Sequence, residues 1–152
     1  MKRLYIFSIL FILAIVSVNA QVSKIFEQYS DSKGVTSVYI SSTMLRMIPD
    51  LKTGDVELKG MTDKLNFIRV LSTEKSDVAS KIANELNSQI KKDSYEILIS
   101  ANDGDEKANI YMKTDSKGVN EYLIVARESN ELSIVLINGT ITPADVQKMN
   151  LK

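Results

Sequence analysis

Apolar residues recur along the chain with two different periods, and the period separates the expected helices from the expected strands. Apolar residues three and four positions apart predict a short helix over Val22 to Tyr29 and a longer amphipathic helix over Ser76 to Lys91. Runs rich in β-branched and aromatic residues, bounded by polar segments, predict strands. These strands are expected over Val35 to Ser41, Leu65 to Leu71, Tyr95 to Asn102, Glu106 to Thr114, Val119 to Glu128 and Glu131 to Asn138.

Short polar joints connect the later strands: Asn-Asp-Gly-Asp, Asp-Ser-Lys-Gly and Ser-Asn. Joints of this length favour antiparallel hairpins, because a parallel connection needs a crossover of about a dozen residues or more. The last two runs carry apolar residues at both odd and even positions, which is typical of central strands covered on both faces. The pattern therefore predicts an α+β fold in a single domain, with helices packed against a mainly antiparallel β-sheet.

A short helix is expected after the first strand, where Ser42 or Thr43 can act as the N-cap and Pro49 ends the helix. Its apolar positions are Met44, Leu45, Met47 and Ile48. We interpret these positions as the buried face of the helix. The alternative is that Met44 and Met47, together with Arg46, form an adaptable surface that contacts a partner.

Two further segments are marked by local signals. The segment from Asp50 to Thr62 is polar and contains two glycines, which predicts a loop with room for a small hairpin. A closing helix is expected near the C-terminus, with Thr142 as its N-cap and Pro143 as its first helical residue. Asp145 then lies in the first turn, where an acid interacts favourably with the helix dipole.

The chain begins with the features of a signal peptide. Two basic residues precede an uncharged, mainly apolar run from Leu4 to Val18, and small residues precede an expected cleavage point between Ala20 and Gln21. A helix that spans a membrane needs about 20 apolar residues, so this run favours a cleaved signal over an uncleaved anchor. We therefore expect export to the periplasm or the exterior, with residues 1–20 as the signal peptide and residues 21–152 as the single mature domain.

Composition narrows the range of functions. The sequence contains no Cys, so the mature chain carries neither a disulfide nor the lipid of a bacterial lipoprotein, and packing alone must stabilise its fold. Basic and acidic residues number 19 each, and loss of the signal removes two basic ones, so no positive excess favours nucleic acid. Because His, Cys and Trp are all missing, we expect no enzymatic activity, cofactor or metal site.

The acidic stretch around Gly104 is a candidate turn or cation site. The calcium loop of an EF-hand spreads its oxygen ligands over about 12 residues, whereas Asp103 and Asp105 lie close together between two expected strands. The alternating residues beside the stretch are Ile97, Ile99 and Ala101 before it and Ala108, Ile110 and Met112 after it. Asp-Gly in this setting is a strong hairpin signal. We interpret the stretch as a turn, with a weak cation site at Asp103 and Asp105 as the alternative.

Two Ser-x-x-Lys spacings, Ser30 to Lys33 and Ser88 to Lys91, raise the alternative of a serine hydrolase with a lysine base. The sequence Lys52-Thr53-Gly54 also matches a motif of penicillin-binding enzymes. The order and spacing of these motifs differ from the pattern of those enzymes. Chance matches in a chain rich in Ser and Lys explain them better.

Several motifs give the chain a resemblance to a known family. They are Val35-Thr36-Ser37-Val38-Tyr39-Ile40-Ser41, Thr43-Met44-Leu45-Arg46-Met47, Tyr95-Glu96-Ile97-Leu98-Ile99, Glu121-Tyr122-Leu123-Ile124-Val125 and Ile137-Asn138-Gly139-Thr140-Ile141. Together with a signal that ends in Asn-Ala-Gln, they resemble DUF4252, a domain of unknown function in small exported proteins of Bacteroidetes. The resemblance covers nearly all of the mature chain. It implies export, an architecture and a setting in envelope regulation, and it assigns no activity.

Two functional hypotheses remain. The first is a non-enzymatic exported protein of the cell envelope, a regulatory or accessory module that binds another protein through a sheet edge or the surface around Met44, Arg46 and Met47. The alternative is a periplasmic carrier that holds a small ligand or cation in a pocket between the sheet and the helices. The polar contacts expected in such a pocket are Tyr residues and Asp55, Glu57 or Asp103.

Overall fold

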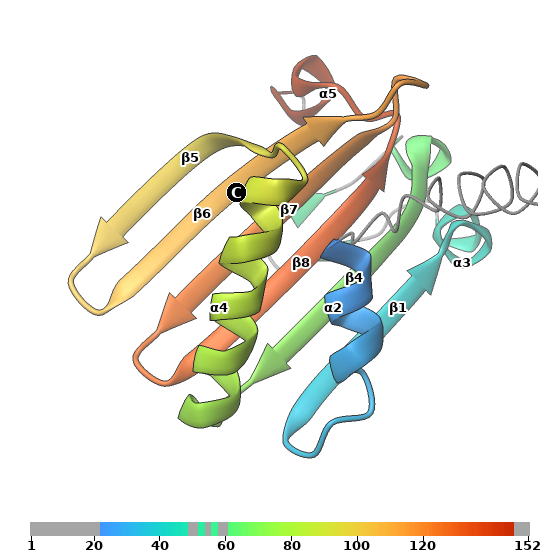
Figure 1. Cartoon of the computed structure of the whole chain (residues 1–152). Coiled ribbons are helices and arrows are strands. Elements are labelled where there is room, and N and C mark those ends of the chain that lie inside the picture. The colour runs from blue at the N-terminus through green and yellow to red at the C-terminus, as the bar shows by residue number, and fades with distance from the viewer. Residues whose placement is uncertain (1–21, 49–51, 54–55, 58–60, 148–152) are drawn as a thin grey trace, which may run out of the picture.

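Six antiparallel strands form the sheet on which the molecule is built (Figure 1). A computed structural model describes residues 22–48, 52–53, 56–57 and 61–147. In sheet order, the strands are β1 (Val35–Ser41), β4 (Leu65–Thr73), β8 (Glu131–Gly139), β7 (Asn120–Glu128), β6 (Glu106–Thr114) and β5 (Glu96–Asp103). β8 and β7 are the central strands, as predicted, but their second face is only partly covered, since Ile124 and Val135 are half-buried. The predicted single-domain α+β fold is confirmed.

Two helices, α2 (Val22–Tyr29) and α4 (Ser76–Lys92), lie side by side on one face of this sheet (Figure 1). Each helix places its apolar residues in one stripe that packs on the strands. The buried helix residues are Val22, Ile25, Phe26, Tyr29, Ala79, Ile82, Leu86 and Ile90, and the buried strand residues are Leu71, Leu123, Leu132, Ile134 and Leu136. We call this side of the sheet the covered face.

The acidic stretch between β5 and β6 forms the predicted hairpin. Asp103 pairs with Glu106, so the loop consists of Gly104 and Asp105. Gly104 has a φ of +59°, and glycine with positive φ at the first loop position is the pattern of a type II′ turn. The interpretation of this stretch as a turn is confirmed.

The alternation expected along β5 is interrupted by a bulge. The sequence spacing places Ile97 and Ile99 on the same face, but Ile97 pairs with Tyr111 and Ile99 pairs with Ile110. Successive residues of β6 point to opposite faces, so these two partners lie on opposite sides of the sheet. The register shift therefore turns Ile97 toward the covered face and Ile99 toward the other face.

Short elements cover one end of that other face. They are α3 (Ser42–Met47), the 3₁₀ helix η2 (Thr62–Lys64) and the chain that leads into α5 (Pro143–Gln147). The residues buried there are Leu45, Met61, Leu65, Ile68, Tyr122 and Ile141. Between α3 and η2, β2 (Lys52–Thr53) pairs with β3 (Val56–Glu57), which confirms the small hairpin within the predicted loop.

The start of α5 has the predicted cap. The Asp145 amide donates to Thr142 Oγ1 at 3.3 Å, and the Thr142 amide donates to Asp145 Oδ2 at 2.9 Å. Lys64 also pairs with Asp145 at 2.7 Å, which links α5 to η2. These contacts hold the pKa of Asp145 below its usual range, chiefly through the hydrogen bond from Lys64.

Two predictions for α3 are wrong. Its N-cap is Ser41 rather than one of the two following residues, and Ser41 Oγ accepts a hydrogen bond from the Met44 amide at 3.3 Å. The helix buries Leu45 against the sheet, whereas Met44 is 47% exposed and Met47 is 72% exposed. A helix of six residues can place only a narrow stripe against the sheet, and the two methionines lie outside that stripe.

Some predictions fall on residues that the structure does not describe. These include the signal peptide and its cleavage point at Ala20 and Gln21, and also Asp55. For Glu57, only the backbone pairing with Lys52 is described. Within the described ranges, no helix combines the length and the apolar character needed to cross a membrane.

Candidate functional site: the open face of the sheet

The face opposite α2 and α4 presents its side chains in rows, because residues paired across neighbouring strands point the same way. One row runs across all six strands and contains Val38, Val70, Val135, Ile124, Ile110 and Ile99. We call it the valine–isoleucine row. Its outer members Val38 and Ile99 are 42% and 55% exposed, and the four inner residues are half-buried. The row is a continuous apolar band that the described elements cover only in part.

A row of small residues lies next along the strands. It contains Thr36, Ser72, Ser133, Ala126, Ala108 and Ala101, one from each strand. Two residues along a strand correspond to about 6.7 Å, so this small-residue row runs parallel to the valine–isoleucine row at that distance. The short side chains leave a hollow of about 660 Å³, and all six residues of the row line it.

An acidic row borders the hollow on its far side. Glu131 pairs with Glu128, Glu128 with Glu106, and Glu106 with Asp103, so four carboxylates stand next to one another across β8, β7, β6 and β5. All four residues line the hollow. Like charges directly opposite in a sheet are destabilising. The acidic row therefore costs the isolated domain some free energy of folding.

The nearest basic residues of these strands belong to the covered face. Lys107 pairs with Arg127, and both alternate with the residues of the open face. The Arg127 guanidinium donates to Ser80 Oγ on α4 at 3.1 Å, so it points away from the acidic row. Among the ion pairs of the described residues, none includes a carboxylate of the acidic row. Its charge is therefore left to solvent or to a binding partner.

We call the side of the sheet that carries these three rows the open face. The predicted contact residues Met44, Arg46 and Met47 are all exposed on α3, at the end of the open face that Leu45 helps to cover. They lie together on one helix, but the acidic row stands at the opposite ends of the strands. The predicted contact residues and the acidic row are therefore two separate features, at opposite ends of the open face.

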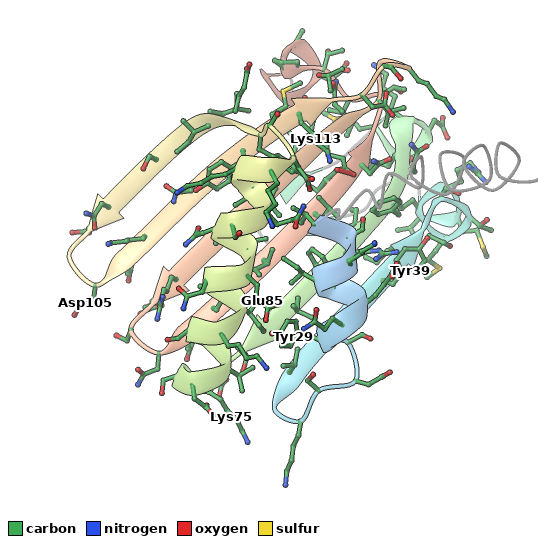
Figure 2. All side chains as sticks on the ribbon, in the orientation of Figure 1. Tyr29, Tyr39, Lys75, Glu85, Asp105 and Lys113 are labelled. Atoms are coloured by element: carbon green, nitrogen blue, oxygen red, sulfur yellow. The ribbon has the colours of Figure 1, made fainter. Side chains whose placement is uncertain are left out.

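The acids predicted to bind a cation do not lie in one pocket between sheet and helices. Asp103 belongs to the acidic row on the open face. Asp105, at the tip of the β5–β6 hairpin (Figure 2), lines a different hollow of about 450 Å³ together with Ala83, Leu86 and Asn87 of α4. In the part of the chain that the structure describes, no group of three acidic residues could hold a metal ion.

The polar contacts of the covered face join the helices to each other and to the sheet. Tyr29 on α2 and Glu85 on α4 point toward one another (Figure 2), and the Tyr29 hydroxyl donates to Glu85 Oε1 at 2.7 Å. Burial and this hydrogen bond raise the pKa of Tyr29 to about 12. Near the end of α4, the Tyr95 hydroxyl donates to Glu121 Oε1 at 2.9 Å, and Lys113 lies 3.2 Å from the same oxygen. The hydroxyls of both tyrosines are therefore hydrogen-bonded to carboxylates within the fold.

The serine–lysine hypothesis finds no matching contact. The Ser30 hydroxyl donates to the Glu27 carbonyl at 3.0 Å. Across the described residues, no hydrogen bond joins a lysine to Ser30 or to Ser88. A lysine base would need such a contact to activate either hydroxyl.

The sequence reasoning missed the three rows. Their residues are drawn from six strands, and neighbours such as Val70 and Val135 are separated by more than sixty positions along the chain. One signal was available in the sequence. Along the last two strands, apolar residues such as Ile124 and Val135 alternate with the core residues and so belong to the opposite face. That signal showed that the second face is apolar, but strand order was needed to align it.

Residues 29–149 match the model of the family described as Domain of unknown function (DUF4252). The match includes all six strands of the sheet. It confirms, at the level of the family, the resemblance found in the sequence motifs. No curated protein and no solved structure matches the chain.

Proposed function

The chain belongs to the DUF4252 family, and we propose that it is a non-enzymatic exported protein of the cell envelope that binds another protein through its open face. In this role it is a regulatory or accessory module. Export rests on the sequence that precedes the cleavage point between Ala20 and Gln21. The absence of His and Cys from the sequence supports a role without catalysis.

The valine–isoleucine row is the observation that carries the proposal. Six β-branched apolar side chains form one band across the sheet, and its ends at Val38 and Ile99 are 42% and 55% exposed. Exposed apolar surface that is continuous and rimmed by polar residues marks an interaction site more often than scattered apolar residues do. Met44 and Met47 extend the exposed apolar surface at the α3 end.

A carrier of a small ligand is the second candidate. The hollow over the small-residue row has a volume of about 660 Å³, which lies within the range of small-molecule sites. Its floor consists of Ala, Ser and Thr side chains, and its rim carries the acidic row. A ligand held there would need to be cationic or rich in hydrogen-bond donors.

Site-specific photo-crosslinking in the native cells tests the proposed function. A photo-reactive amino acid is placed at Ile99 in a tagged copy that keeps its signal, and captured proteins are identified by mass spectrometry. Ile97 is the matched control, because it lies on the same strand with 56% exposure but faces the covered side. We expect one reproducible protein partner from Ile99 and a much weaker product from Ile97.

Equal capture from both positions, or capture of no protein by a folded copy, would overturn the binding proposal. Fractionation of the same cells tests export, because the processed chain should begin at Gln21 and leave the cytoplasm. If Ile99 captures nothing, thermal stability in the presence of small cations and polyamines tests the carrier instead, since a ligand that binds the folded state raises the melting temperature.

A further inference from the structure

We propose that the segment of the partner that docks on the open face is a cationic amphipathic α-helix, lying across the strands over the small-residue row. This inference rests on the proposed function and names the chemistry of its partner. The apolar stripe of the helix contacts the valine–isoleucine row, and Lys or Arg on one flank contacts the acidic row.

Backbone chemistry selects a helix. The N–H and C=O groups of β4, β8, β7 and β6 are engaged on both sides by neighbouring strands, so the face of the sheet offers a peptide no backbone partners. A segment that lies on this face must therefore satisfy its own backbone hydrogen bonds, and a helix does so within itself. An extended peptide would have to add to an edge strand instead.

The dimensions of the face fit one helix. The valine–isoleucine row and the acidic row are four residues apart along the strands, or about 13 Å, and a helix with its side chains is about 10 Å wide. The small-residue row lies midway between them and allows a close approach. Six strands spaced about 4.8 Å apart span about 24 Å, the length of about 16 helical residues.

The acidic row determines the charge expected on the flank of the partner's helix that lies over it. Four carboxylates from Asp103, Glu106, Glu128 and Glu131 stand in one row, and none has an ion-pair partner within the described residues. Three basic residues line the hollow. Lys107 and Arg127 project to the covered face, which leaves Lys75, immediately before α4, as the basic residue near the row. A cationic flank would remove the repulsion within the row on binding.

The same charge argues against two other occupants. An anionic membrane surface repels an acidic row, so lipid is a poor fit. A second copy of this chain would have to cover the valine–isoleucine row while it brings a further set of carboxylates to the interface. A partner that supplies both an apolar stripe and positive charge matches both rows.

Designed peptides test this inference on the purified mature chain. The probe is a helix of about 18 residues with a Leu stripe and Lys on one flank, and its two controls carry Glu in place of Lys or the same composition in shuffled order. Fluorescence anisotropy at low and high salt measures the binding of each. We expect the Lys peptide to bind at least about tenfold more tightly than either control, with an affinity that falls as salt rises.

Substitutions on the protein locate the binding site. Glu106→Gln combined with Glu128→Gln should weaken the Lys peptide by about fivefold and reduce the salt dependence. Ala108→Leu should weaken it by a similar factor by filling the hollow, whereas the control Ala108→Ser keeps a small side chain there. Circular dichroism checks that each variant is folded.

Equal affinity for the Lys and Glu peptides would overturn the cationic helix, and so would a dimer of the mature chain that Ile99→Asp dissociates. The crosslinking result separates these failures from failure of the proposed function. If Ile99 still captures a partner that Ile97 does not, the open face binds protein and only the helix is wrong.

Discussion

The two faces of the sheet are made from the same strands but are completed to different degrees. On the covered face, Leu71, Leu123, Leu132, Ile134 and Leu136 are at most 2% exposed beneath α2 and α4. On the open face, the residues that alternate with them are half-buried at best in the valine–isoleucine row and shrink to Ala and Ser beyond it. Among the described residues, the covered face is buried along the length of the two helices, whereas the open face is buried only at the end beneath α3 and η2.

The difference shows how one strand can serve two purposes. In β8, Ile134 packs into the core while its neighbour Val135 belongs to the open face. Burial of apolar surface stabilises the fold in proportion to the area removed from water. An apolar residue that stays partly exposed contributes less of this stabilising free energy in the free protein. A partner that covers the residue removes its remaining surface from water, which stabilises the complex.

The largest expected effect compares two isoleucines on the two faces. Ile134→Ala should lower the free energy of unfolding by about 2 to 5 kcal/mol, because it opens a cavity in the core beneath the helices. Ile124→Ala on β7 should cost less than half as much, since Ile124 is only half-buried. Urea denaturation of both variants measures the difference, and equal losses would show that the open face is as well covered as the other.

A smaller effect is expected for the contact between the two helices. Tyr29→Phe removes the hydrogen bond to Glu85 and should lower the free energy of unfolding by about 1 kcal/mol at neutral pH. The pKa of Tyr29 is raised from 10.0 to about 12, so the stability it provides is present below pH 10 and is lost as pH rises toward 12. The variant should therefore lose less stability than the wild type over that interval. A wild-type profile that runs parallel to the variant's would contradict this.

At the α5 end of the open face, the contacts of Asp145 depend on its negative charge, so the stability that they provide should be lost in acid. The pKa of Asp145 is held down by Lys64 and by the capping bonds of Thr142. A depressed folded-state pKa contributes stability above the ordinary value near 3.8, and that stability is lost as pH falls below it. The urea midpoint of Asp145→Asn should therefore fall less steeply than that of the wild type as pH is lowered through the acid range. Asp63→Asn, at an exposed acid of η2, is the control, and its midpoint should fall as steeply as that of the wild type.

The smallest effect has the opposite sign. Glu128→Gln removes the central carboxylate of the acidic row, which pairs with both Glu106 and Glu131. We expect it to raise the free energy of unfolding by about 0.2 to 1 kcal/mol at low salt, and less at high salt. A destabilised Glu128→Gln would mean that the row is compensated within the free protein. Glu96→Gln is the control. Glu96 lies on β5 but outside the acidic row, so its substitution should change stability little.

Local pattern was sufficient for most of the fold. The bounds of β1 follow from its β-branched run, those of β6 follow from the polar joints on either side of it, and the hairpin at Gly104 follows from one dipeptide. α3 was the exception, because a helix of one and a half turns gives too little periodicity to tell Leu45 from the exposed methionines beside it.

The open face could not be predicted in the same way. The register shift in β5 separates Ile97 from Ile99, although plain alternation places them together. The rows also depend on β4 lying between β1 and β8, which is a matter of topology rather than of local sequence. An acid such as Glu128 looks like an ordinary turn residue until its pairing with Glu106 and Glu131 is known.

Solvent access to the two faces inside the cell tests the central claim most directly. The chain contains no Cys, so single cysteines can be introduced by Ala101→Cys on the open face and by Asn102→Cys, its exposed neighbour on the other face. Maleimide labelling is compared between the purified protein and intact cells. We predict equal labelling of both in the purified protein and selective protection of Ala101→Cys in cells. Equal labelling of the two positions in cells would contradict the claim that a partner covers the open face.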